Sequence, residues 1–564
     1  MSEVKAPIAD TGEGKESTHP SFGTVTAPIG RVVSVSGSEA IVMLEPTATD
    51  GVSEGSIRAD MGALLRVKTP STIVIGMVSG LSVPIPEKDP KAVEIKVAEL
   101  ELLGEFQRNP DGTLGEFRRG VSTFPALGDA VFPITTDDLR RVYTSQRGSS
   151  IRLGSIHQDR NIPAHVVTDQ LLGKHFAVLG TTGSGKSCSV ALILRSILEK
   201  HPNAHMLLLD PHNEYYRTFE DIAEIINPDN LQLPYWLLTF EEISEILTAP
   251  NGTRDQEAEI LHELVPLAKR RYATHVLNAE DGRLRKPKSV GHITVDTPVP
   301  YRMSDIVTMI DDVMGRLSKP QNLTPYRRLK NRIETISTDA RYGFMFGGLT
   351  VRDNMKEILA RIFRIPVNKK PITIMDLSGI PSEILNVVVS VLSRMTFDLA
   401  LWSGRSVPIH LICEEAHRYV PQDAGLGFEP TKHSISRIAK EGRKYGVSLG
   451  IVSQRPAELD PTILSQCNTI FALRMTNSKD QEFVNAAVTD SARGLLSFLP
   501  SLADAEAIAV GEGVSLPMRI KFDRLPNDRV PRSMSTRFSE QWNTDVRSDT
   551  FLENVVERWR AQRR

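Results

Sequence analysis

The sequence of 564 residues has only three cysteines and almost no net charge. The cysteines, Cys188, Cys413 and Cys467, lack any paired metal-ligand spacing, which argues against a cysteine-built metal site and fits a reducing cytoplasm. Lys and Arg number 67 against 69 Asp and Glu, so the net charge of −2 gives no overall attraction to nucleic acid. Any contact with a polyanion therefore has to be local.

Long apolar stretches are also missing. We find no apolar run of about 18 residues, the length that a membrane-spanning helix needs, and so expect no membrane partner. The amino end, residues 1–21, is polar and lacks the apolar segment of a secretory signal, so we interpret it as a flexible tail. With 40% hydrophobic and 24% charged residues the composition is typical of soluble globular proteins, and the length favours two or three domains.

Short β-branched runs separated by turn residues dominate residues 22–155. They predict strands at 31–36, 39–44, 64–68, 72–78 and 92–103, followed by a Gly- and Pro-punctuated stretch at 120–133. Short strands joined by Gly, Ser and Pro favour a small barrel. We therefore expect an all-β barrel domain that ends near residue 155.

Strand and helix signals alternate from residue 156 to about residue 525. Apolar strand runs are predicted at 176–179, 205–209, 372–375, 409–413, 448–452 and 469–472, with helices such as 186–199 and 382–401 between them. Such runs suit a parallel sheet that is buried on both faces, which predicts a three-layer α/β domain.

Two further regions differ from this alternation. Between about 220 and 370 helix-like stretches take over, which predicts a helical insertion with helices at 241–247, 256–272, 303–317, 323–337 and 351–362. Residues 526–564 are polar and rich in arginine, and they predict an arm that ends with a helix at 550–562.

The glycine-rich octet at 180–187 matches G-x-x-x-x-G-K-[ST] at every fixed position, follows a predicted strand and opens a predicted helix. In that context the backbone N–H groups cradle phosphates, Lys186 reaches the β- and γ-phosphates of ATP, and the Ser187 hydroxyl ligates Mg²⁺. The competing interpretation is a chance match in a glycine-rich turn. The predicted nucleotide-binding residues are Gly180, Thr181, Thr182, Gly183, Ser184, Gly185, Lys186, Ser187 and Cys188.

Polar residues at the ends of other predicted strands are candidates for the groups that ATP hydrolysis needs, a carboxylate near Mg²⁺ and a residue that orients the attacking water. Glu414 ends an apolar strand and is predicted to support Mg²⁺ through its water shell, while Glu415 orients or activates the attacking water. Asp210 and, less directly, Glu214 follow another strand, where ligands of parallel sheets collect. Gln454 is placed to sense the γ-phosphate or the water. Solvated turns and an N-cap aspartate are the ordinary alternatives for these residues.

The predicted helix around 434–445 carries a basic face. In a ring-shaped ATPase an arginine of one subunit stabilises the transition-state charge at the nucleotide of the next subunit. Arg443 is our candidate for this role and Arg437 the second choice, against the ordinary interpretation of a solvated helix face.

Together these motifs resemble the HerA family. The match comprises five blocks in this order: the strand and phosphate loop at 176–187, Asp-Pro-His-Asn-Glu-Tyr at 210–215, Cys-Glu-Glu-Ala-His at 413–417, Lys-Glu-Gly-Arg-Lys-Tyr-Gly at 440–446 and Ser-Gln-Arg-Pro at 453–456. The resemblance covers about residues 22–530. It implies a RecA-like ATPase core with a helical insertion, preceded by a HAS-type barrel similar to the one in rotary ATP synthases.

The resemblance also implies partners. Family members related to FtsK are homohexamers that move double-stranded DNA and stimulate a separate effector, either a NurA-type nuclease in DNA-end resection or a sirtuin-like NADase or other nuclease in antiphage defence. We find no nuclease or NADase motif in this chain. Lys174 is a further candidate for contact with a neighbouring nucleotide. Basic clusters at 269–271, 283–288 and 327–328 are candidates for the DNA pore, although each is more often a solvated face.

Two other classes stay open at this point. An ATP-binding ring could act mainly as a scaffold that assembles and gates an effector, and a metabolite kinase could use the same phosphate loop without a ring. The first acidic position, Glu414, and the long loop at 421–430 both depart from the common pattern. The longer Glu side chain can still reach a Mg²⁺-bound water, so we expect ATPase activity.

Overall fold

The structure is a computed structural model, and its contacts divide the chain into two compact units, Met1–Arg141 and Val142–Arg564. The predicted tail at 1–21 and the basic cluster at 283–288 lie outside the described residues. Those residues are 27–45, 59–83, 95–110, 113–144, 148–248, 254–281, 292–316, 323–347, 351–423, 425–488, 492–532, 538–543 and 549–560.

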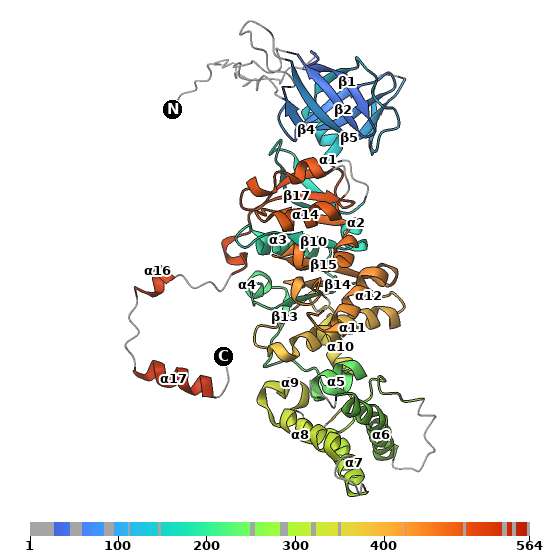
Figure 1. Ribbon diagram of the computed structural model, residues 1–564, viewed down its shortest axis with the longest axis vertical. Coiled ribbons are helices and arrows are strands. Elements are labelled where there is room, and N and C mark those ends of the chain that lie inside the picture. The colour runs from blue at the N-terminus through green and yellow to red at the C-terminus, as the bar shows by residue number, and fades with distance from the viewer. Residues whose placement is uncertain are drawn as a thin grey trace, which may run out of the picture. The chain divides into compact units, whose positions relative to one another are not determined.

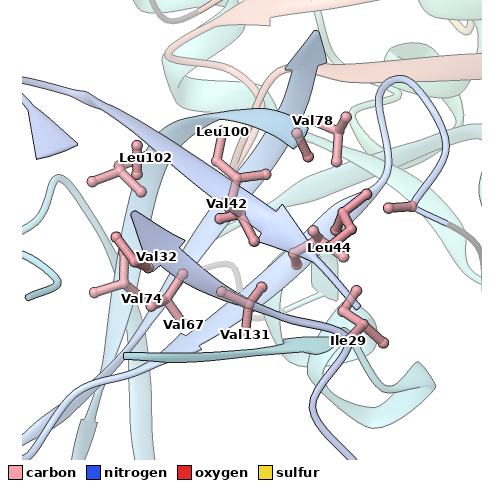
Figure 2. Close-up of a cluster of buried hydrophobic side chains, with 14 residues drawn as sticks. Ile29, Val32, Val42, Leu44, Val67, Val74, Val78, Leu100, Leu102 and Val131 are labelled. Atoms are coloured by element: carbon pink, nitrogen blue, oxygen red, sulfur yellow. The ribbon is translucent and has the colours of Figure 1, made fainter. Parts of the chain in front are cut away.

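The first unit is a closed antiparallel barrel, as the strand pattern predicted. Its strands follow the order β2-β1-β7-β3-β4-β5-β6, and an additional pairing of β2 with β5 closes the ring. Alternate side chains point inward, so that β2 buries Ala40, Val42 and Leu44. Figure 2 shows Val42, Leu44 and other labelled aliphatic side chains gathered between the strands. The strands are β1 (Gly30–Ser36), β2 (Glu39–Leu44), β3 (Leu64–Lys68), β4 (Thr72–Ser82), β5 (Lys96–Arg108), β6 (Leu114–Arg119) and β7 (Ala130–Pro133).

The end of the barrel differs from the prediction. Helix α1 (Thr136–Thr144) follows β7, and the division between the units falls at Arg141 rather than near residue 155. Strand β8 (Ser150–Ile156), which the prediction left in the barrel, pairs with β9 (Pro163–Val167) and β18 (Met518–Phe522) in the other unit. Short alternating strands look alike in both sheets, so only the pairing assigns β8.

The second unit is built on a mixed sheet of the order β12-β13-β11-β14-β15-β10-β16-β17-β18-β8-β9. The strands from β12 to β16 are parallel, and those from β16 to β9 are antiparallel. Six parallel strands are buried at every residue, as expected for a sheet covered on both faces. These are β10 (Phe176–Leu179), β11 (Met206–Asp210), β13 (Ile372–Asp376), β14 (Ile409–Cys413), β15 (Val447–Ser453) and β16 (Thr469–Leu473).

Helices cover both faces of this sheet (Figure 1). Helix α3 (Lys186–Lys200) connects β10 to β11 and runs in one direction along the sheet. Helix α11 (Ser382–Trp402) connects β13 to β14, and α12 (Glu429–Tyr445) connects β14 to β15; both connections run in the opposite direction. Right-handed crossovers therefore place α3 on one face and α11 with α12 on the opposite face. The predicted three-layer α/β architecture is confirmed.

Helix α11 qualifies the statement that long apolar stretches are missing. Its segment Ile384–Trp402 is long and apolar enough to span a membrane by length and composition, but 72% of that segment is buried inside the protein. It packs against α12 and the sheet, which accounts for its apolar character without a membrane.

Strand β15 (Val447–Ser453) lies between β10 and β14, so the phosphate-loop strand and the strand of the paired glutamates are not direct neighbours. Leu179 pairs with Ser453, and Cys413 pairs with Ile451. The carboxyl ends of the three strands therefore meet at one edge. Side chains that follow each strand, among them Gln454, converge there.

The insertion joins β12 (Ala223–Ile226) to β13, two neighbouring parallel strands at one end of the sheet. The predicted range of 220–370 is too wide at its start, because β12 belongs to the sheet. The helices of the insertion are α5 (Phe240–Leu247), α6 (Arg254–Asp281), α7 (Met303–Arg316), α8 (Thr324–Thr338), α9 (Gly343–Phe346) and α10 (Met355–Phe363).

The carboxyl-terminal part completes the sheet and then leaves it. Strands β17 (Glu506–Gly511) and β18 extend the sheet beyond β16, and no strand was predicted for either segment. The predicted terminal helix is present as α17 (Asp549–Arg560), preceded by the short α16 (Phe538–Gln541).

Candidate nucleotide-binding and hydrolysis site

The phosphate loop runs from the end of β10 to the start of α3, and its glycines are required by its geometry. Gly183 and Gly185 have φ values of 79° and 94°, which side chains other than glycine rarely adopt. A Cβ atom at Gly180 would lie 2.7 Å from the Leu473 side chain. Thr181 is anchored to β16, since its N–H and its hydroxyl both donate to the Arg474 carbonyl oxygen.

Lys186 is buried at the start of α3 beside the paired glutamates. Its Nζ donates a hydrogen bond to Glu414 Oε1 at 2.5 Å and lies 3.6 Å from Glu415 Oε1. Burial acts to lower the pKa of Lys186, but the two carboxylates outweigh it and the pKa is raised. Burial raises the pKa of Glu414 to about 7, against the effect of Lys186. The lysine is therefore held as a cation directly behind the phosphate loop.

The residues predicted to hold Mg²⁺ fit that ion. Ser187 Oγ donates to Glu214 Oε2 at 2.6 Å, so the hydroxyl oxygen has a carboxylate beside it. Glu414 Oε2 is buried and has no hydrogen-bond partner among the described residues. A hydrated divalent cation would find two carboxylates and a hydroxyl here, the oxygen ligands that Mg²⁺ prefers. Glu214, a secondary candidate from the sequence, thus lies in the site.

Asp210 organises the loop that carries Glu214. Its carboxylate accepts hydrogen bonds from the backbone N–H groups of His212 and Tyr215 at 3.2 and 3.0 Å. Burial raises the pKa of Asp210 to about 6. Asp210 therefore lies at the predicted edge of the sheet. Its two hydrogen bonds to backbone N–H groups hold the turn that brings Glu214 to Ser187.

Glu415 and Gln454 are in direct contact. Gln454 Nε2 donates to Glu415 Oε1 at 2.5 Å, and Thr182 Oγ1 donates to Gln454 Oε1 at 2.5 Å. A continuous chain of hydrogen bonds thus joins the phosphate loop to the candidate catalytic carboxylate through β15. Glu415 has a φ of 52°, an uncommon conformation for a residue with a side chain and one that occurs at functional sites.

Two polar residues of this network carried no prediction. His417 Nδ1 lies 3.3 Å from Glu415 Oε2 and 3.1 Å from Ser453 Oγ. His417 belongs to the Cys-Glu-Glu-Ala-His block and Ser453 to the Ser-Gln-Arg-Pro block. Their place within motif blocks was the only signal, since nothing in the spacing indicates that the two blocks touch.

The two candidate arginines have different surroundings. Arg437 lies over the ring of Phe397, 4.0 Å from its centroid, and 4.0 Å from Asp398. Arg443 is exposed near the carboxyl end of α12. Arg437 is therefore engaged within its own chain, whereas Arg443 presents its guanidinium to solvent. Lys174 forms an ion pair with Glu512 of the same chain.

The basic clusters proposed for a DNA pore do not all reach the surface. Lys269 is buried and donates from Nζ to the carbonyl oxygens of Val295 and Thr297, at 2.5 and 2.7 Å. It fastens α6 to the segment before α7 and cannot contact DNA, which corrects that part of the prediction. Arg270, Arg271 and Arg327 are exposed.

Fold and site together define the class of this protein. A phosphate loop on a parallel sheet, a buried lysine and paired glutamates two strands away make it a RecA-like P-loop ATPase. Within that class residues 151–396 match the family model "Helicase HerA, central domain". The chain carries the central domain of the HerA family, and the resemblance indicated by the five motifs is confirmed.

Relatives of similar length agree with this assignment. The chain is 26% identical over 439 residues to the DNA double-strand break repair helicase HerA of Pyrococcus furiosus, covering 70% of this chain and 72% of that protein. It is 28% identical over 481 residues to the probable DNA double-strand break repair helicase HerA of Methanocaldococcus jannaschii, covering 77% and 86%.

A solved structure is similar at a lower level. VirB4 of Thermoanaerobacter pseudethanolicus is 17% identical with a TM-score of 0.44, and the match covers 68% of this chain and 99% of that chain.

Proposed function

We propose that this protein is a homohexameric ATPase that moves along double-stranded DNA as a translocase or helicase. The observation that carries the proposal is the hydrogen-bonded assembly of Thr182, Gln454 and Glu415 around the phosphate loop, within a chain that carries the HerA central domain. Relatives named as DNA double-strand break repair helicases support DNA as the substrate.

The residues of the chain divide the work of hydrolysis. The loop amides and Lys186 would bind the β- and γ-phosphates, and Ser187, Glu214 and Glu414 would hold Mg²⁺ with its water shell. Mg²⁺ would neutralise charge that develops on the phosphates. Glu415 orients the attacking water, and Gln454 connects that carboxylate to the loop that holds the γ-phosphate.

The site is completed by a second copy of the chain. Arg443 of a neighbouring subunit is proposed to contact the γ-phosphate and stabilise the charge of the transition state. Its exposure supports this role, whereas Arg437 is already stacked on Phe397. Hydrolysis then depends on the ring.

Contact with DNA is proposed to be local and directed at phosphates. With a net charge of −2 the chain has no overall attraction to nucleic acid, but exposed arginines such as Arg270 and Arg327 would be repeated sixfold in the proposed ring. Contacts of this kind grip the backbone without reading bases.

The motor is proposed to act in the cytoplasm with a separate effector chain, a nuclease or a sirtuin-like NADase, in DNA-end processing or antiphage defence. The described residues contain no cluster of His, Cys, Asp and Glu that could hold a nuclease metal. We propose that the effector function comes from another protein.

ATP turnover with and without linear double-stranded DNA tests the proposal. We expect DNA to bind the ring and to raise kcat, since a motor couples hydrolysis to its track. If DNA neither binds nor accelerates turnover, with the partner present as well, the translocase function is wrong. An ATP-binding scaffold that assembles and gates the effector then becomes the better interpretation.

A further inference from the structure

His417 lies between Glu415, the candidate catalytic glutamate, and Ser453 at the end of the neighbouring strand β15. It lies in a short helical turn, Ala416–Arg418, directly after Glu415. Its Nδ1 atom lies 3.3 Å from Glu415 Oε2 and 3.1 Å from Ser453 Oγ. Because a carboxylate only accepts hydrogen bonds, the proton of the imidazole must be on Nδ1 for the Glu415 contact to form.

Ser453 is itself fixed. Its carbonyl oxygen accepts a hydrogen bond from Gly180 of the phosphate loop, and its hydroxyl oxygen accepts one from the Arg455 N–H. The serine therefore provides a rigid support at the end of β15. Both contacts of His417 use the single N–H of Nδ1, so Ser453 Oγ accepts from the same group that faces Glu415 and holds the ring beside the carboxylate.

The contacts of Glu415 come from both sides. Oε1 accepts from Gln454 and faces Lys186, while Oε2 faces only His417 among the contacts described. With a φ of 52° the backbone of Glu415 holds an uncommon conformation, and its side chain is 5% exposed. Without His417, Oε2 of the carboxylate would lose its contact with Nδ1 and the group could rotate.

We infer that His417 is a positioning residue that holds Glu415 in the orientation needed to direct the attacking water. The inference deepens the proposed ATPase mechanism and rests on the role given there to Glu415. Displacement of a reacting group by about 1 Å can cost about a hundredfold in rate, so a contact of this kind is expected to act on turnover.

Substitution of His417 should leave the fold intact. The side chain lines a surface pocket of about 370 Å³ together with Arg418, Pro421 and Gln422, so a smaller residue opens space to solvent and not a sealed cavity. Nucleotide binding depends on the phosphate loop and Lys186, which His417 does not contact among the described residues.

The test compares three variants of the full-length protein in steady-state ATPase and nucleotide-binding measurements. His417→Ala should lower kcat about 10- to 100-fold with KM and the Kd for ATP unchanged. His417→Asn can place an amide N–H where Nδ1 lies and should restore much of the rate. His417→Gln places its amide nearer to Nε2 and should restore less. A purely structural role predicts no such ranking.

The path through the serine is tested separately. Ser453→Ala removes the hydroxyl support, and its effect on kcat should be largely absent in a His417→Ala background, because both act on the same contact. Equal and independent losses would contradict the path.

The outcomes separate this inference from the proposed function. If the wild-type protein hydrolyses ATP and Glu415→Gln abolishes turnover while His417→Ala leaves kcat unchanged, the positioning role is wrong and the ATPase mechanism stands. If Glu415→Gln retains full turnover, the assignment of Glu415 fails, and the inference fails with it.

Discussion

At the scale of single residues, the site separates nucleotide binding from hydrolysis. Lys186 belongs to the phosphate loop and pairs with Glu414, whereas Glu415 follows β14 and is joined to Thr182 of the loop through Gln454. Substituting one or the other should therefore affect different steps.

Lys186→Ala is expected to weaken ATP binding about 10- to 100-fold, since it removes a charge-assisted hydrogen bond to phosphate. It also leaves Glu414 buried without its cation. Equilibrium binding of a fluorescent ATP analogue measures the change. An unaltered Kd would contradict the role of the lysine.

Glu415→Gln is expected to bind ATP as the wild type does and to lower kcat by about a hundredfold or more, because an amide cannot accept the proton of the attacking water. Single-turnover hydrolysis with prebound nucleotide measures the step directly. Unchanged turnover would show that another carboxylate directs the water.

The positions of the site residues could be anticipated because each follows a short apolar strand, and parallel strands bring their carboxyl ends together. Glu214, Glu415 and Gln454 all lie at that edge. The contact of His417 with Ser453 could not be anticipated, because 36 positions separate the two residues in the chain. Lys269 was misplaced because charge alone does not reveal burial.

At the scale of elements, the burial of Lys269 within the insertion has a measurable effect on stability. Burial lowers its pKa from 10.5 to about 8. Between these two values the unfolded chain holds a proton that the folded chain has released, so the free energy of unfolding rises with pH across that window.

We expect wild type to gain stability relative to Lys269→Met from pH 8 to pH 10, by roughly 1–3 kcal/mol. Both proteins are unfolded with urea at several pH values and the difference in free energy is plotted. If the stability difference between the two proteins does not change with pH, Lys269 does not lose its proton on folding in this pH range. The lost hydrogen bonds to Val295 and Thr297 contribute only a constant offset.

Two of the strands that escaped prediction, β6 and β18, share a physical cause. The parallel strands β10, β11, β13, β14, β15 and β16 are apolar runs and were predicted nearly at their bounds, whereas β12, which has two half-buried residues, was not predicted. Strands β6 and β18 alternate with charged or half-exposed residues, so their runs are short and weak. Their pairing with distant strands stabilises them, and such pairing is not visible in local sequence.

At the scale of the whole molecule, the proposed shared site makes activity depend on neighbouring copies. Mass measurement should give a hexamer, and a fully active monomer would exclude a role for Arg443 in a neighbour's site.

Mixed rings provide the sharper experiment. Arg443→Ala alone should lower kcat about a thousandfold with the Kd for ATP unchanged, and Lys186→Ala alone should also be inactive. When the two are mixed before assembly, about a quarter of the interfaces pair an intact phosphate loop with an intact arginine, and ATPase activity should return. Arg437→Ala is the matched control, and it should affect stability more than complementation. No recovery would mean that Arg443 acts within its own chain or not at all.

The insertion between β12 and β13 has a consequence for how the protein can be handled. Because these strands are parallel neighbours, the chain must in any case cross from the end of one to the start of the other, and the helices α5 to α10 are an extended form of that crossover. The crossover begins at β12 and ends at β13, and the strands β11, β14 and β15 separate both of these from β10 and its phosphate loop in the sheet. A fluorescent reporter carried in this segment could therefore follow the motor at work while the catalytic edge of the sheet stays untouched.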